Sequence, residues 1–422
     1  MRNTHRAVFL SVTIVSAEVG CGSSASAGFV DDSKARLEMR NMFIKRDYRQ
    51  EGGRPSPREW AQGFTLRFES GFTDGPIGFG LDAMVQAGVK LASTKKHSGT
   101  GLLAVDSNGR AEDEYSELGL TAKLRVSQSV LRIGTLQPRL PVISYNDTRL
   151  LASTYRGGML TSQEINGLTL NVGRLTRYNT RDSTNNERIG YPLAGVESDY
   201  LDVAGGSYAF SPQLTASYYY AKMEDVYQQS FFGIVHDFHL GKGVSLRTDL
   251  RYFDSDDDGG RKLRSDRRVD GGRIDNHMST GMVTLSAKGH QLGLGYQRLS
   301  GGGDFPSPGI DPYIANLSML NTFTKAETDA WQLRYAYDFA GLGIPGLTFA
   351  TKYVKAHNVK AAAVNNGREW ERNSDIAYVI QSGALKGASF RLRNASYRSS
   401  NGLTKNQMDE IRIIIDYALP IW

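Results

Sequence analysis

Basic side chains recur at alternate positions, opposite apolar and aromatic residues. Between residues 331 and 339, Arg334 stands opposite a face made by Trp331, Leu333 and Tyr335. Alternate residues of a β-strand point to opposite faces, so such a strand has one apolar face and one basic face. A guanidinium stays charged and presents several N–H donors in a fixed fork, which suits a carboxylate. The alternation predicts this orientation for Arg40, Arg125, Arg247, Arg251, Arg334, Lys352, Arg391, Arg393 and Arg412.

Such a set would attract an anion and pass it from one basic group to the next, without making or breaking bonds. The alternative for any single member is a structural ion pair with a neighbouring carboxylate such as Glu38, Asp249 or Asp338. For the whole set that alternative is weaker, because fewer carboxylates than basic groups are visible on the same faces. Arg177 is a further candidate, although the alternation of its strand slips near Arg174.

Two segments between strands carry more apolar residues than a solvated loop needs. The segment from Gln137 to Arg156 contains Leu140, Val142 and Leu150. We expect it to fold inward, where Tyr145 and Arg149 would face the lumen; a loop that only packs on the wall is the alternative. The segment from Ser300 to Tyr313 also carries enough apolar and aromatic side chains, Tyr313 among them, to narrow the lumen; a solvated external loop is an equal alternative. If it folds inward, Asp311 would face the arginines and orient an amine or hydroxyl of the solute.

The C-terminal segment indicates where the apolar faces point. Ile411, Ile413 and Ile415 begin an apolar face that continues to Ile421, whereas Arg412 and Asp416 lie on the other face. This pattern is typical of the closing strand of an outer-membrane β-barrel. Trp422 is one position out of step, which predicts a bulge at the strand end. Short turns alternate with long polar segments along the chain, as expected for periplasmic turns and external loops.

Length and hydropathy fit the same architecture. The 422-residue chain has a mean hydropathy of −0.38 and, after the leader, no apolar run long enough for a membrane-spanning helix. About 20 to 24 residues per strand and connection give roughly 16 to 20 strands, and barrels of about 16 to 18 strands enclose water. A soluble β-sandwich or solenoid is the alternative, but in such a fold the water-facing sides of the strands would have no reason to carry mostly one sign of charge.

Residues 1–27 resemble a secretory signal, with Arg2 and Arg6 before a short apolar stretch and a small-x-small site at Ala25 to Ala27. A lipoprotein signal would need an apolar residue in place of Glu18. Cleavage would leave residues 28–422 as one barrel domain in the outer membrane of a Gram-negative bacterium. The mature chain then lacks cysteine, because Cys21 is the only one. The net charge of +6 is too diffuse to indicate nucleic acid.

A series of short motifs resembles the OprD family of substrate-specific outer-membrane channels, also called the Occ family. The resemblance extends over essentially the whole mature chain. Its motifs are the segments Gly28 to Ser33, Trp60 to Phe64, Phe68 to Phe72, Gly78 to Ala83, Leu136 to Pro138, Met223 to Tyr227, Gly343 to Phe349, Tyr378 to Gly383, Ser389 to Arg393 and Asp416 to Trp422.

The resemblance implies an all-β transmembrane antiparallel barrel of about eighteen strands, monomeric or weakly trimeric, with a constriction made by inward loops. It also implies passive uptake of carboxylate-bearing solutes along a basic ladder. Residues 134–142, 146–151 and 156–162 are more similar to the branch that favours small cyclic or aromatic organic acids. The branch for basic amino acids is the alternative.

Two other classes of function are less consistent with the sequence. An outer-membrane barrel enzyme would need a clustered acid, base and nucleophile, and the seven histidines suggest none. A plugged structural barrel would conduct nothing. We therefore expect no catalytic residue, no metal and no cofactor. The expected partners are a small organic anion, membrane lipid and lipopolysaccharide, the last through a basic run at residues 261–268.

Overall fold

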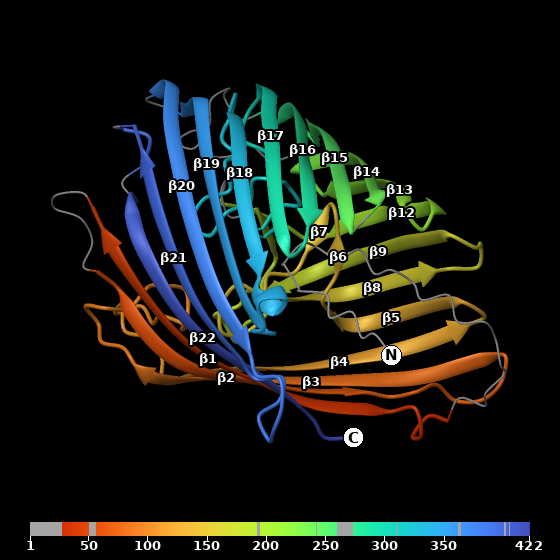
Figure 1. Ribbon diagram of the computed structural model, residues 1–422. Helices are drawn as coiled ribbons and strands as arrows, with labels where there is room; N and C mark the ends of the chain where they lie inside the picture. Colours follow the sequence, from red (N-terminus) through yellow and green to blue (C-terminus); the bar gives the residue numbers. More distant parts are fainter. Residues whose placement is uncertain are drawn as a thin grey trace.

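The computed structural model describes residues 28–49, 56–191, 195–241, 243–259, 273–309, 311–361, 364–400, 402–404 and 406–422. The leader and the basic run 261–268 lie outside these residues. Eighteen strands form one antiparallel sheet that closes on itself, which confirms the expected fold (Figure 1). They are β1 (Lys34–Tyr48), β2 (Arg58–Glu69), β3 (Ile77–Ala92), β4 (Glu114–Val126), β5 (Ser129–Leu136), β8 (Thr154–Ser162), β9 (Leu168–Asn179), β12 (Leu201–Ser211), β13 (Leu214–Met223), β14 (Tyr227–Gly241), β15 (Val244–Asp257), β16 (Asp275–Ala287), β17 (His290–Gly302), β18 (Asp329–Asp338), β19 (Leu347–Ala361), β20 (Val364–Val379), β21 (Ser389–Ser399) and β22 (Met408–Pro420).

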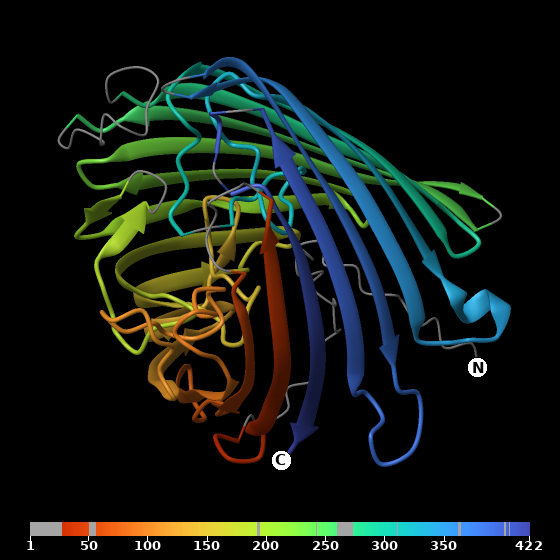
Figure 2. The same ribbon diagram turned by 90° about the vertical axis from the view of Figure 1, so that its left-hand side faces the viewer.

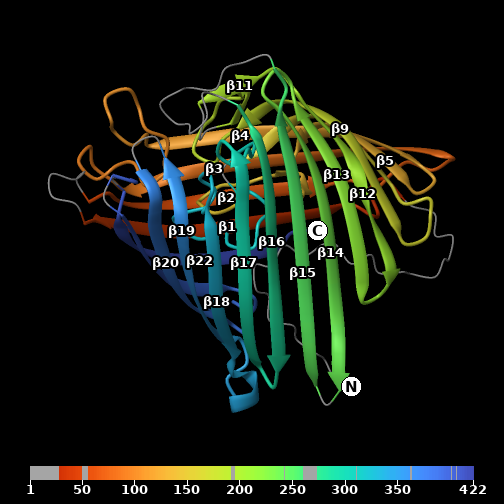
Figure 3. The same cartoon turned by 90° about the horizontal axis from the view of Figure 1, so that it is seen from above.

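The first and last strands close the barrel. β1 pairs with β2 on one side and with β22 on the other, so no edge is left unpaired between them (Figure 3). At the seam, the N–H groups of both Ile421 and Trp422 donate to the carbonyl of Ala35. Two donors on one acceptor mark a local bulge, as the position of Trp422 predicted.

The two faces of the wall differ as the alternation predicted. Leu118, Leu294 and Phe79 point outward and keep 60%, 63% and 57% of their surface exposed. Their neighbours along each strand point inward; Glu117 and Gly295, for example, are buried. Apolar side chains without a protein partner belong against lipid, so this exposed band is the membrane face. Among the described residues, no helix has the length and apolar character needed to cross a membrane; the one 3₁₀ helix is Phe339–Leu342.

Several segments that the polar sequence suggested as loops are strands or inward folds. One of the long polar segments runs from Ala356 to Asn373. Because β19 continues to Ala361 and β20 begins at Val364, most of this segment is paired sheet and not loop. Cross-strand hydrogen bonds form there in spite of the polar composition.

The described parts of four long connections fold into the barrel (Figure 2). They are residues 93–113, residues 137–153 with the paired strands β6 (Arg139–Leu140) and β7 (Ile143–Ser144), residues 180–191 and 195–200 with the paired strands β10 (Ile189–Tyr191) and β11 (Val196–Ser198), and residues 303–309 and 311–328. Their apolar side chains are buried against the inner wall. Leu102 and Leu103 pack with Met42 and Ile44 of β1, for example. Val142, Ile189 and Phe305 share a second cluster with inward residues of β9 to β17.

We expect the turn at Ser382 to lie at the periplasmic end and Asn406 at the external end, because the short turns of such barrels are periplasmic. Both residues are exposed. Cysteine at Asn406 is expected to react with an impermeant maleimide in intact cells, and cysteine at Ser382 only after the outer membrane is opened. Reaction of both from outside would contradict the topology.

Candidate functional site

Basic residues form a row around the inner wall from β15 to β1. The strand register places Arg334 of β18 opposite Lys352 of β19, and Arg393 of β21 opposite Arg412 of β22. Continuing the row, β22 pairs Asp416 with Arg40 of β1. The other members of the predicted set on this inner face are Arg125, Arg247, Arg251 and Arg391. Exposed apolar residues such as Leu250 and Phe390 are the strand neighbours of Arg251 and Arg391.

Arg391 and Arg393 are the most accessible pair in this row that shares one carboxylate. Their guanidinium nitrogens lie 3.6 and 2.7 Å from the Asp375 carboxylate, and their side chains keep 29% and 28% of their surface exposed. One carboxylate cannot balance two guanidinium groups. The pair therefore carries a net positive charge that a solute carboxylate can meet.

Other wall arginines are balanced by their own acids. Arg247 bonds to Asp237 at 2.7 Å and Arg251 to Asp249 at 2.6 Å. The Arg251 guanidinium also lies 3.7 Å from the centre of the Tyr313 ring. Ion pairs with acids on the same strand or on the next strand thus neutralise more of the row than the sequence alternation indicated.

The surplus of positive charge arises where acids are shared or missing. Glu38 forms ion pairs with both Arg36 and Arg67, and Glu410 forms ion pairs with both Arg46 and Arg412. Among the described residues, no carboxylate lies within ion-pair distance of Arg125, Arg334 or Arg139. Arg125 stacks on Phe72 instead, and Arg334 donates to Thr284 at 2.6 Å. The lumen face is therefore net basic.

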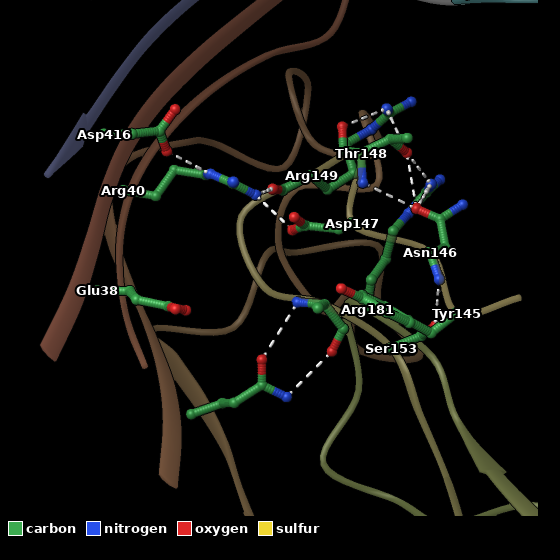
Figure 4. Close-up of polar contacts among 12 residues, drawn as sticks. Glu38, Arg40, Tyr145, Asn146, Asp147, Thr148, Arg149, Ser153, Arg181 and Asp416 are labelled. Carbon is green, nitrogen blue, oxygen red and sulfur yellow. Dashed lines mark hydrogen bonds and ion pairs between the residues drawn. The ribbon is translucent and has the colours of Figure 1, made fainter. Parts of the chain in front are cut away.

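Arg40 joins the wall to the inward segment 137–153 (Figure 4). Its guanidinium donates to Asp416 on β22, to the Asp147 carboxylate and to the backbone carbonyl of Arg149, each at 2.7 Å. Gln86 of β3 holds the same segment at a second point, by exchanging two hydrogen bonds with the backbone of Ala152. The segment is thus fixed across the lumen.

Arg412 corrects the prediction that every basic residue of the row is open to solutes. Only 1% of Arg412 is exposed. It bonds to Glu410 and donates to the carbonyls of Thr148 and Met319, at 3.3 and 3.2 Å. Arg412 therefore ties both inward segments to the wall, a role that strand alternation alone does not reveal.

Glu371 of β20 is the main anchor of the segment 303–328. Its carboxylate accepts the backbone N–H groups of Met319, Leu320 and Asn321 at 2.8, 3.0 and 2.9 Å. Lys352 donates to the carbonyl of Leu317, two residues earlier. The wall thus supplies both acceptors and donors for the backbone of this segment, which a buried turn requires.

The two inward segments also bond to each other. Asn146 donates to the Asp311 carboxylate at 2.7 Å, and Arg181 donates to the Asn146 side-chain oxygen at 3.0 Å. Burial raises the pKa of the Asp311 carboxyl, and the nearby guanidinium groups of Arg181 and Arg149 oppose that shift. Asp311 thus binds a loop side chain, and its orienting role toward a solute remains a prediction.

Two predicted arginines lie elsewhere than expected. A register shift between β8 and β9 puts Leu175 and Tyr178 in the buried inner cluster, so Arg177 stands on the opposite, outer side. Arg149 is only 6% exposed, because the segments 93–113 and 137–153 close over it; its side chain contacts the carbonyls of Thr100 and Thr148. Neither guanidinium faces the open lumen.

Sequence reasoning missed an exposed arginine on the inward hairpin. Arg139 of β6 stacks over Tyr145, with its guanidinium 4.5 Å from the ring centre, and bonds to the Tyr145 hydroxyl. This pair presents a cation and an aromatic face together. In the sequence, this contact was indicated by the six-residue spacing between Arg139 and Tyr145 across a turn that contains Pro141. Among the described residues, no cluster of His, Cys, Asp and Glu could hold a metal ion.

Comparisons with known proteins agree on one family. The model for "outer membrane porin, OprD family" matches residues 27–421. The porin-like protein GalP of Pseudomonas putida is 35% identical over 398 residues, which cover 93% of each chain. The crystal structure of Pseudomonas aeruginosa OccK9 (OpdG) superposes with a TM-score of 0.88 at 38% identity, covering 93% of this chain and 100% of that one. The structure of OpdK from the same organism with vanillate gives 0.86 at 36% identity, covering 94% and 100%.

Neutralising Arg391 and Arg393 tests whether the accessible basic residues of the row select for anions. In the Arg391→Gln/Arg393→Gln variant, anion uptake is expected to fall about fivefold or more, since each lost contact is worth about 1 kcal/mol in water. The reversal potential in a salt gradient should shift towards cations. The matched control is Arg298→Gln/Arg372→Gln, which removes two arginines from the outer face. Equal selectivity in all three proteins would exclude the pair from the selective path.

Replacing Glu371 tests the anchor. The Glu371→Gln variant should weaken the docked state of residues 303–328 by about 2 kcal/mol, because charge-assisted hydrogen bonds to three N–H groups are lost. Single-channel recordings should show larger and noisier conductance. Glu114→Gln, at an exposed position of β4, is the control. Unchanged conductance would show that the segment is held by other contacts.

Proposed function

The chain belongs to the OprD family of outer-membrane porins, in the outer membrane of a Gram-negative bacterium, and on that premise we propose a passive channel for small carboxylate-bearing solutes. The preferred class in this proposal is cyclic or aromatic organic acids. The observation that carries it is the pair Arg391 and Arg393, which shares one carboxylate and stays accessible.

The charge distribution supports an anionic solute. In the lumen, two wall arginines often share one protein carboxylate. A solute carboxylate can therefore pair with the arginine that is not fully neutralised, without displacing a protein carboxylate. Each contact is exposed to water, where an ion pair is weak, so the solute can leave again. Binding that is favourable but shallow at each step is what passive conduction requires.

The inward segments support selection of a ring. Tyr145 with Arg139 and Tyr313 with Arg251 each place an aromatic face beside a guanidinium. An aromatic acid matches both features: its flat ring can pack on the aromatic face, and its carboxylate can pair with the guanidinium. The relative OpdK, solved with vanillate, shows that a porin of this family accommodates an aromatic acid. No bond-making chemistry is part of this proposal: the chain acts as a channel and not as an enzyme.

Competitive uptake into proteoliposomes tests the substrate class. Benzoate is expected to enter faster than benzamide and faster than arginine, because the lumen face carries a net positive charge. Raising the salt concentration should reduce the lead of benzoate, since the long-range part of the attraction is screened within about 8 to 10 Å at physiological ionic strength. Faster entry of arginine at both salt levels would assign the channel to basic amino acids.

A further inference from the structure

Two arginines lie side by side on the outer wall, near the external ends of β8 and β9. Arg156 and Arg177 are register partners, and both are exposed. Like charges placed directly opposite each other across a strand pair are destabilising. Among the described residues, no carboxylate lies within ion-pair distance of either one. The Arg177 guanidinium donates to the carbonyl of Thr176, at 2.7 Å.

The neighbouring outer basic residues differ in this respect. Arg174 forms a two-point ion pair with Asp202 at 2.6 and 2.7 Å, and Lys222 lies 2.9 Å from Asp258. The chain therefore supplies acids for the neighbouring cations Arg174 and Lys222 and leaves the Arg156–Arg177 pair without one. An external anion would relieve the repulsion.

An apolar groove begins directly below the two arginines. Its volume is about 630 Å³. Its lining is mainly apolar, with Leu131, Ile133, Leu160 and Val172, and it also includes the ion-paired Arg174 and Asp202. Gly158, two residues along β8 from Arg156, lies in the groove, so no side chain fills that position. A residue advances about 3.3 Å along a strand, so the charged pair and the groove are within about 7 Å of each other.

We propose that the outer wall of β8 and β9 binds lipopolysaccharide, with Arg156 and Arg177 holding a phosphate group and the groove below them holding an acyl chain. The order of the two features matches such a lipid: the charged group lies at the external rim and the apolar part towards the membrane. Arginine pairs bind phosphate through parallel N–H···O bonds. This site is on the opposite side of the wall from the lumen, so it is independent of the transported solute.

Affinity for deep-rough lipopolysaccharide, measured with the detergent-solubilised full chain, tests the charged half of the site. The Arg156→Gln/Arg177→Gln variant is expected to bind about 10- to 30-fold more weakly, as about 1 kcal/mol per basic residue at an anionic lipid surface implies. The control Arg298→Gln/Arg372→Gln removes two other exposed outer arginines and should bind normally. Dephosphorylated lipid should bind the unmodified protein as weakly as intact lipid binds the double variant.

The groove is tested separately with Gly158→Leu. A Cβ at Gly158 would have its nearest neighbour, Ile133, at 3.7 Å, so the added side chain occupies the groove without a clash. This variant should bind intact lipid more weakly, whereas Gly341→Leu, in the 3₁₀ helix Phe339–Leu342 with nothing within 4 Å of the added Cβ, should bind it normally.

Three results would overturn the proposal. The first is equal lipid binding by the double arginine variant. The second is full competition by inorganic phosphate at the concentration of the lipid, which would indicate a free-anion site. The third is loss of self-association in Gly158→Leu with lipid binding unchanged, which would assign the groove to a second copy of the chain.

Discussion

The width of the barrel is the constraint from which the rest of the structure follows. Eighteen strands enclose a space that inward side chains cannot fill, so backbone segments fill part of it. Backbone buried in this way must find hydrogen-bond partners. The wall supplies them: Glu371 accepts three N–H groups, Gln86 pairs with Ala152, and Arg412 and Arg40 donate to loop carbonyls.

This constraint divides the lumen arginines into two kinds. Arg412 and Arg149 are buried among carbonyls and hold the inward segments in place. Arg391 and Arg393 remain accessible and share the charge of a single aspartate. Arg40 belongs to both kinds, since it binds loop and wall while a quarter of its side chain is exposed. A selective path and its scaffold are thus built from the same residue type, and burial distinguishes the two.

Strand periodicity was enough to predict the barrel and the inner face of most basic residues, because side-chain direction along a strand is a local property. Where a strand is irregular the inference fails: one extra residue of β9, Thr176 between Leu175 and Arg177, turns Arg177 outward. The role of Glu371 was also beyond prediction, because its partners at residues 319–321 lie about fifty positions away in sequence. Likewise, the burial of Arg412 depends on two segments whose inward fold is fixed only by tertiary contacts.

Locating a bound aromatic acid would test the account most directly. Crystals grown with 4-bromobenzoate allow the bromine to be found by anomalous scattering. A bromine peak is expected in the lumen, with the carboxylate within hydrogen-bond distance of Arg391 or Arg393. A peak confined to the outer wall, or a lumen site whose carboxylate contacts neither arginine, would contradict it.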